Sequence, residues 1–410
     1  MQNNIPITTL KNGIRVIHQE VQSPISHFGV LINAGTRDEA DDKGGLAHFV
    51  EHTIFKGTVK RNSYQVTKRV ENAGGDLNAC TSKEETDFHV SFLSPDYERS
   101  IELMSDIFFN ATFPEKELTK EKDVVLEEIN YYKDSPAELI FDDIEDIVFA
   151  GHPLGRNILG TKKSVKLLQR NNILDFIRQN YTSDHVVLSS VGNISTDQFL
   201  KYCNKYFGEH PLPTSLSHRT PFTDYRPTFT KKHKNTSQSH IIMGTTAYTL
   251  HDPQRVPFTL LTNLLGGQAM SAKLNVAIRE KKGLAYSVEA NYSPFSDAGL
   301  FTVYIGCDNH ATDKCIKLTF KELKKLSEQK LGTLQLHYAK KQFLGQWAIT
   351  NETKLNEMLS MGRSALSFNE VETSSSAIQK IESITADQIL HTANEIFNPD
   401  NFTTLLYSKI

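Results

Sequence analysis

The chain has 410 residues, of which 39% are hydrophobic and 23% are charged, and its formal net charge is -3. The length suits two domains of about 200 residues each, and no apolar run approaches the roughly 20 residues of a membrane span. A charge so close to neutral offers no basic face to nucleic acid, so we expect neither nucleic acid nor a membrane as a partner.

The start of the chain and its cysteines bear on the compartment. Residues 1–6 have neither the features of a secretory signal nor the Arg-rich character of a transit peptide, so we expect a cytoplasmic location or an already processed chain. The four cysteines are too sparse for a disulfide framework and none are paired at zinc-ribbon spacing. They are expected to be core or surface thiols: Cys80, Cys203, Cys307 and Cys315.

The first elements in chain order are predicted to be a hairpin, a strand and a loop. A tight-turn signal at residues 11–13 lies between two short runs, so residues 8–21 should form the hairpin. The apolar run 27–33 predicts the next strand. The polar, glycine-bearing loop 34–45 then leads into a short helix, which ends at residues 56–58.

This short helix carries His48, Glu51 and His52 in the order H-x-x-E-H. Residues four apart lie on one face of a helix, so the two imidazoles can bind a single ion. Glu51 lies on the adjoining flank, where its carboxylate can reach a water molecule at the metal without binding the metal itself. The pattern is that of the inverted zincins, and the alternative is a chance grouping on a surface helix.

Further helices and a strand pair follow the metal helix. Residues 63–73 predict a helix, residues 77–81 and 86–93 predict paired strands, and Ser94-Pro95 predicts the start of another helix.

A longer helix is predicted over residues 114–132, and its apolar face also carries Glu121 and Glu128. Carboxylates on a buried face are costly unless they are paired or bound to a cation. Two kinds of partner are possible. One is a lysine or arginine elsewhere in the chain. The other is a metal ion for which His48 and His52 supply only two ligands, so that a third is needed.

The first domain is expected to span residues 1–209. A helix at 164–180, a strand at 185–191 and a helix at 195–207 complete it. Residues 210–238 hold four prolines among Ser, Thr and Lys, which predicts an interdomain linker.

The second domain, residues 239–410, repeats the order of elements of the first and therefore indicates a duplicated domain. The counterpart of the metal helix has no ligand side chains. We expect an α+β fold of two similar domains of about 200 residues, each a mainly antiparallel sheet packed with helices. The predicted elements are a strand at 240–246, a helix at 256–265 and strands at 285–292 and 299–306.

Nearly the whole chain resembles the pitrilysin/insulinase family of zinc peptidases. Within that family it is most similar to the short two-domain members akin to the catalytic subunit of the mitochondrial processing peptidase and its bacterial relatives. The resemblance is carried by residues 44–52, 72–79, 151–155 and 279–286, together with Glu121, Glu127 and Glu128.

The resemblance implies one zinc ion per chain, bound by His48, His52 and Glu128. Glu127 is the fallback ligand only, because it points about 100° away from Glu128 on the helix. Glu51 would accept a proton from the attacking water and pass it to the leaving amine. Glu121 would orient a ligand side chain.

The resemblance also implies residues that bind the substrate. Asn78 and Ala79 would bind substrate backbone by edge addition to the strand at 77–81, although a turn-flanking role is as ordinary for Asn78. Arg279 and Tyr286 would bind the scissile carbonyl and steady the oxyanion.

The implied function is that of a zinc metalloendopeptidase that hydrolyses unfolded peptides or presequence-like segments inside a closed chamber. The expected partners are peptide substrates and a second copy of the chain in a homodimer. The alternative is a non-catalytic relative that serves as a scaffold or regulatory subunit. Such relatives lose metal ligands or the base, whereas this chain keeps every one.

Overall fold

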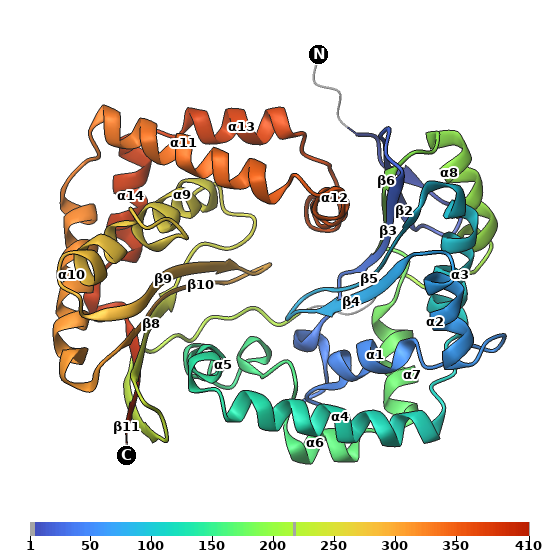
Figure 1. Ribbon diagram of the computed structural model, residues 1–410, viewed down its shortest axis with the longest axis horizontal. Helices are drawn as coiled ribbons and strands as arrows, with labels where there is room; N and C mark the ends of the chain where they lie inside the picture. Colours follow the sequence, from blue (N-terminus) through green and yellow to red (C-terminus); the bar gives the residue numbers. More distant parts are fainter. Residues whose placement is uncertain (1–4, 216–218, 410) are drawn as a thin grey trace. The chain divides into compact units, whose positions relative to one another are not determined.

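The structure is a computed structural model that describes residues 5–215 and 219–409. Both sheets are packed with helices, so the predicted α+β class with two similar domains is confirmed (Figure 1). Among the described residues, every helix is too short or too polar to span a bilayer. The chain forms two compact units: Met1–Ile129, Arg156–Arg219 and Ala348–Ser374 make the first, and Asn130–Gly155, Thr220–Trp347 and Ser375–Ile410 make the second.

The sheet of the first unit has six strands in the order β1-β2-β6-β3-β5-β4, and only the pair β2–β6 is parallel. All residues of β6 are buried, as expected for an inner strand, whereas exposed and half-buried residues alternate along the edge strand β4. The predicted hairpin and strand pair are confirmed. The strands are β1 (Thr8–Thr9), β2 (Arg15–Glu20), β3 (Ile25–Ile32), β4 (Asp76–Thr81), β5 (Thr86–Leu93) and β6 (Val186–Gly192).

The helices predicted for the first unit are present with one correction, and the helix at 354–368 was not predicted. The single helix expected at 164–180 is wrong, because Leu168 is extended with ψ 135° and Gln169 starts a new helix. The helices that lie wholly or mostly in this unit are α1 (Leu46–Ile54), α2 (Ser63–Glu71), α3 (Tyr97–Asn110), α4 (Glu115–Lys133), α6 (Lys162–Leu167), α7 (Arg170–Asn180), α8 (Thr196–Cys203) and α12 (Lys354–Phe368).

The sheet of the second unit has the order β7-β11-β8-β10-β9, with only β7–β11 parallel. This order matches β2-β6-β3-β5-β4 strand for strand, as a duplicated domain would. Residues 229–234 of the segment expected to be a linker form the edge strand β7. The strands are β7 (Phe229–Lys234), β8 (Ser239–Thr246), β9 (Ala285–Pro294), β10 (Gly299–Cys307) and β11 (Thr403–Lys409).

In the second unit the sequence predicted only the helix at 256–265. One of the helices that it did not predict is α5, which starts with a proline in its first turn and lies against β8 and β11. Its buried face joins the core of that sheet through Ile140 and Ile144. The helices that lie wholly or mostly in this unit are α5 (Pro136–Val148), α9 (Arg255–Gly266), α10 (Thr312–Glu328), α11 (Thr333–Thr350), α13 (Ser374–Ser383) and α14 (Ala386–Ile396).

A late segment of the chain completes the first unit. Helix α12 lies on β3 and β6, and its Met358 is fully buried in a cluster with Leu31 and Val191. A Cβ at Gly29 would lie only 2.8 Å from the Met358 sulfur, so the helix packs where β3 has no side chain. The compact units therefore differ from the contiguous domains 1–209 and 239–410 expected from the sequence.

Candidate metal centre

Helix α1 places His48 and His52 side by side. Most of the helix is buried, and it packs against α7 and the edge strand β4. The two imidazole rings have centroids 4.5 Å apart. Only 9% of the His48 side chain and 22% of the His52 side chain are exposed, so both nitrogens that could bind a metal lie in a partly dry site.

The start of α1 is fixed by contacts that its own sequence does not provide. Gly45 is the N-cap residue, with a left-handed φ of 90° and no side chain to cap the helix. The buried carboxylate of Glu39 instead accepts hydrogen bonds from the N–H groups of Gly45 at 3.0 Å and Ala47 at 2.8 Å. Burial raises the pKa of Glu39 to about 8, while these donors oppose the rise.

The loop that contains Leu159 and Gly160 contacts the backbone just before α1. A Cβ at Gly160 would lie 2.2 Å from the carbonyl oxygen of Gly44, and one at Gly45 would lie 2.6 Å from that of Leu159. Glycine is therefore required on both sides of the contact, and the backbone before α1 has little freedom to move.

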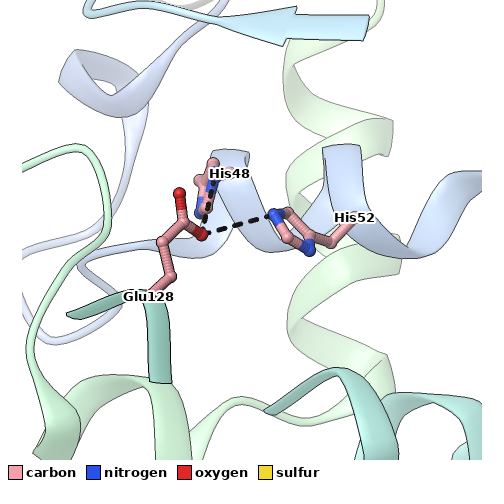
Figure 2. Close-up of side chains that lie close together, drawn as sticks. All are labelled: His48, His52 and Glu128. Carbon is pink, nitrogen blue, oxygen red and sulfur yellow. Dashed lines mark ion pairs between the residues drawn. The ribbon is translucent and has the colours of Figure 1, made fainter. Parts of the chain in front are cut away.

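Helix α4 brings Glu128 to the two histidines (Figure 2). Its Oε2 lies 3.7 Å from Nε2 of His48 and 3.6 Å from Nε2 of His52. These distances exceed an ordinary hydrogen bond. Ligand atoms that surround a tetrahedral zinc at about 2.1 Å are about 3.4 Å apart, so the spacing fits three ligands of one ion. These are the residues that the sequence had grouped, and one ligand atom from each lies within 4.8 Å of the others.

Glu127 does not share this position. It is exposed, whereas Glu128 is half-buried and reaches the histidines. The helical-face argument therefore agrees with the geometry, and the assignment of Glu128 as a zinc ligand stays a prediction.

Glu121 contacts a lysine, which is the first kind of partner that the sequence left open, and one of the two histidines. Its Oε2 lies 3.3 Å from Nδ1 of His52, and its Oε1 lies 2.6 Å from the ammonium group of Lys56. A carboxylate can only accept here, so Nδ1 of His52 carries the proton and Nε2 keeps its lone pair for a metal.

Glu51 lies on α1 between His48 and His52 in sequence and is half-buried. Burial raises the pKa of its carboxyl group, while the Thr81 hydroxyl and the charge of His52 oppose the rise. Thr81 is the last residue of the edge strand β4, so the carboxylate lies next to the strand expected to bind substrate.

The residues expected to bind substrate lie in both units. Asn78 and Ala79 are neighbours on β4, and Oδ1 of Asn78 accepts a hydrogen bond from the N–H of Ala79 at 2.8 Å. This contact gives Asn78 a local structural role as well. Arg279 and Tyr286 belong to the second unit, in the turn of π-helix Asn275–Glu280 and in β9, and both are exposed. Their roles stay predictions.

Sequence reasoning missed Lys56 and Glu39. Lys56 could have been found, because residues 48, 52 and 56 form one row at four-residue steps and the row continues one residue past the C-cap of α1. Glu39 left no such signal, since an acidic residue in a polar loop is ordinary.

The chain matches two family descriptions in sequence. Residues 15–162 match "Insulinase (Peptidase family M16)", and residues 168–343 match "Peptidase M16 inactive domain". The first match contains α1 and Glu128, and the second contains Arg279 and Tyr286. The two matches follow each other along the chain, as the two-domain resemblance implies.

Relatives of similar length are known from bacteria. An uncharacterized zinc protease of Bacillus subtilis (YmxG) is 30% identical over 97% of this chain and 97% of its own. One from Rickettsia felis is 30% identical over 97% of this chain and 96% of its own.

Two crystal structures share the fold. A peptidase M16 inactive domain from Pseudomonas fluorescens superposes with a TM-score of 0.93 at 18% identity, over 99% of this chain and 98% of that one. A protease from Helicobacter pylori gives 0.90 at 20% identity, over 98% and 99%. With both family matches and full-length relatives at 30% identity, the chain belongs to the insulinase family of peptidases, family M16.

Proposed function

We propose that the protein is a zinc metalloendopeptidase whose catalytic base is Glu51. The observation that carries the proposal is the meeting of His48, His52 and Glu128 around one point, with Glu51 on the same helix as the two histidines. The donor set fits zinc, because imidazole nitrogen and carboxylate oxygen are its usual ligands in catalytic sites. One ion per chain is expected.

A zinc ion at these side chains would supply the positive charge that acidifies the attacking water and polarises the peptide carbonyl. Glu51 accepts the proton of that water on its carboxylate and returns it to the nitrogen of the leaving amine. The raised pKa of Glu51 suits both steps, because a group that is too acidic would not hold the proton between them.

The remaining roles are assigned by family membership and by placement. The peptide backbone would add to β4 as a further strand beside Asn78 and Ala79, since β4 is an edge strand. Arg279 and Tyr286 would hold the scissile carbonyl and the oxyanion. Their exposure in the second unit is consistent with contacts to a ligand or a partner chain.

The substrates proposed are unfolded peptides or presequence-like segments, cut inside a chamber that a homodimer encloses. A substrate strand must be extended to pair with β4, which excludes residues that are already folded into helices or sheets. In the dimer, Arg279 and Tyr286 would act on the zinc site of the partner chain.

The second candidate function is that of a non-catalytic scaffold or regulatory subunit. The second family description contains the word "inactive", but it matches residues 168–343, which hold none of the proposed ligands. Metal analysis of the purified protein together with cleavage of a quenched peptide separates the candidates. A peptidase should contain about one zinc per chain, lose cleavage to a chelator and regain it with zinc. Bound zinc without cleavage of any peptide in a diverse library would favour the scaffold.

A further inference from the structure

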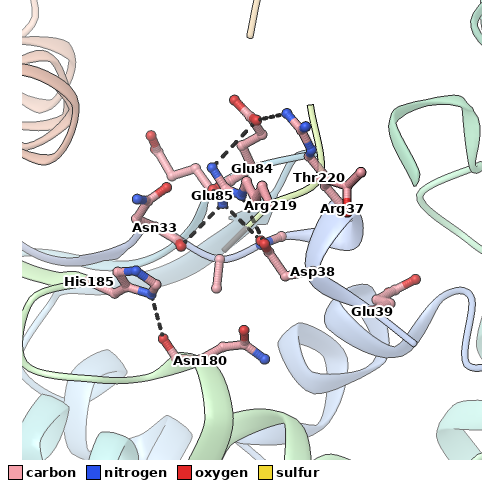
Figure 3. A network of polar contacts seen from close by, with 12 residues as sticks. Asn33, Arg37, Asp38, Glu39, Glu84, Glu85, Asn180, His185, Arg219 and Thr220 are labelled. Carbon is pink, nitrogen blue, oxygen red and sulfur yellow. Dashed lines mark hydrogen bonds and ion pairs between the residues drawn. The ribbon is translucent and has the colours of Figure 1, made fainter. Parts of the chain in front are cut away.

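Three consecutive charged residues precede the metal helix, and each has a different partner. Figure 3 shows the partners of Arg37 and Asp38. Glu39 caps the start of α1. Asp38 binds Arg219, and Arg37 binds Glu84. This short segment therefore contacts the metal helix, the turn between β4 and β5, and the last residue of the first unit before the chain enters the second unit.

The pair Asp38–Arg219 is the strongest of these contacts by geometry. Nε and Nη2 of Arg219 donate to Oδ1 and Oδ2 of Asp38, each at 2.8 Å, which is the two-pronged form of a charged pair. Nη2 also donates to the carbonyl oxygens of Asn33 at 3.2 Å and Glu84 at 3.0 Å. Nη1 of Arg219 also lies 3.4 Å from Oε1 of Glu84. Only 17% of the Arg219 side chain and 9% of the Asp38 side chain are exposed, so loss of Arg219 leaves the Asp38 carboxylate largely buried without a cation in this pair.

The segment around Asp38 is fixed on its other side as well. Arg37 bonds to Glu84 at 2.6 Å through its side chain and to the carbonyl of Lys83 at 2.8 Å through its N–H. A Cβ at Gly35 would lie 2.4 Å from the carbonyl oxygen of Ser82, so the two backbones touch there. Oδ2 of Asp38 also accepts a hydrogen bond from the N–H of Gly35 at 2.9 Å. Because the backbone around Asp38 is held in this way, its carboxylate cannot relax after losing Arg219 without moving Glu39 next to it.

We propose that Arg219 is a positioning residue for the metal helix, acting through Asp38 and the Glu39 cap of α1. Arg219 holds Asp38, the backbone of Asp38 holds Glu39 in place, and Glu39 fixes the N–H groups that begin α1. The linker after the first unit is thereby coupled to the helix that carries His48 and His52. The inference rests on the proposed function only in taking α1 as the metal helix.

Hydrogen–deuterium exchange of the full-length, metal-free protein tests this coupling without requiring zinc or activity. Arg219→Gln should speed exchange of the amides of Gly45 and Ala47 by about tenfold or more, because their acceptor Glu39 is no longer fixed. Arg219→Lys keeps the positive charge but cannot donate two parallel hydrogen bonds to the carboxylate, so it should give a smaller increase in the exchange rate. The matched control is Arg226→Gln, since Arg226 pairs with Asp224 at 3.3 Å but both side chains are mostly exposed. It should leave these amides unchanged.

A double-mutant cycle separates positioning from general destabilisation. If Arg219 acts through Asp38, then Asp38→Asn should speed exchange at Gly45 and Ala47 about as much as Arg219→Gln, and the double variant should add little further. Zinc release to a chelator should accelerate several-fold in the same variants, at a temperature where all of them are folded. Fast exchange confined to the residues around 219, with Gly45 and Ala47 unaffected, would overturn the proposal. Unchanged exchange at Gly45 and Ala47 in Arg219→Gln would thus contradict the coupling. Absence of zinc from the wild-type protein would instead contradict the proposed function.

Discussion

Nδ1 of His52 lies 3.3 Å from Oε2 of Glu121, and this contact decides which nitrogen of His52 can bind a metal. Because the Glu121 carboxylate accepts a hydrogen bond from Nδ1–H, Nε2 is left with its lone pair and faces Glu128 at 3.6 Å. The carboxylate therefore orients His52 as the proposed zinc site requires. The same carboxylate also contacts Lys56, so His52, Glu121 and Lys56 form one chain of contacts.

Glu121→Gln should weaken zinc binding by about 10- to 100-fold, the range typical for partners of metal-bound histidines. Gln keeps one acceptor but loses the charge that fixes the Nδ1–H tautomer. The measurement is competition for zinc with a chelator of known affinity. An unchanged affinity would mean that Glu121 serves only the ion pair with Lys56.

Lys56→Met should weaken zinc binding by a smaller factor, roughly three- to tenfold, because Glu121 would keep its contact with His52 but lose the cation that holds its other oxygen. Lys56→Arg should retain most of the affinity. Lys60→Met is the matched control, since Lys60 is an exposed lysine close by in the chain. Equal effects of the variants at 56 and 60 would contradict the proposed role of Lys56.

Met358→Ala should destabilise the first unit by about 2–5 kcal/mol, because it empties a fully buried site where α12 packs on β3 and β6. Met270, which is 78% exposed, provides the control, and Met270→Ala should change stability by less than about 0.5 kcal/mol. Urea unfolding followed by exchange protection in β3 reports on the first unit itself. Equal protection in the two variants would show that α12 contributes little to that unit.

The sequence predicted the elements whose signal is local. The four-residue spacing of His48 and His52, and the helical face shared by Glu121 and Glu128, were enough to group the residues that the structure brings together. The strand pairs around the short turns at residues 11–13 and 82–85 were predicted for the same reason.

What the sequence did not reveal depends on tertiary contacts. No local pattern predicts that α12 completes the first unit, because the helix fits where Gly29 and Gly362 have no side chains. Arg219 lies in a polar, proline-containing segment whose composition predicts exposure to solvent. Its guanidinium is nevertheless largely buried against Asp38. Glu39 is likewise recognisable as a helix cap only when the N–H groups of Gly45 and Ala47 face it.

The trans arrangement of Arg279 and Tyr286 predicts complementation between inactive variants. Mixing Glu51→Gln with Tyr286→Phe under subunit exchange should form mixed dimers with one intact composite site and one doubly damaged site. Activity should then recover towards about a quarter of wild type, since roughly half of the dimers are mixed and each has one working site of two. A mixture that stays inactive while exchange is shown independently would place the pair in cis or outside the reaction.

The most direct test of the account is the zinc content and turnover of Glu51→Gln measured on the same sample. The substitution removes the proposed base but leaves His48, His52 and Glu128 in place. We predict zinc bound at about one per chain, as in the wild type, with peptide cleavage reduced by several orders of magnitude. Near-normal cleavage by a variant that carries full zinc would contradict the assignment of Glu51 as the catalytic base.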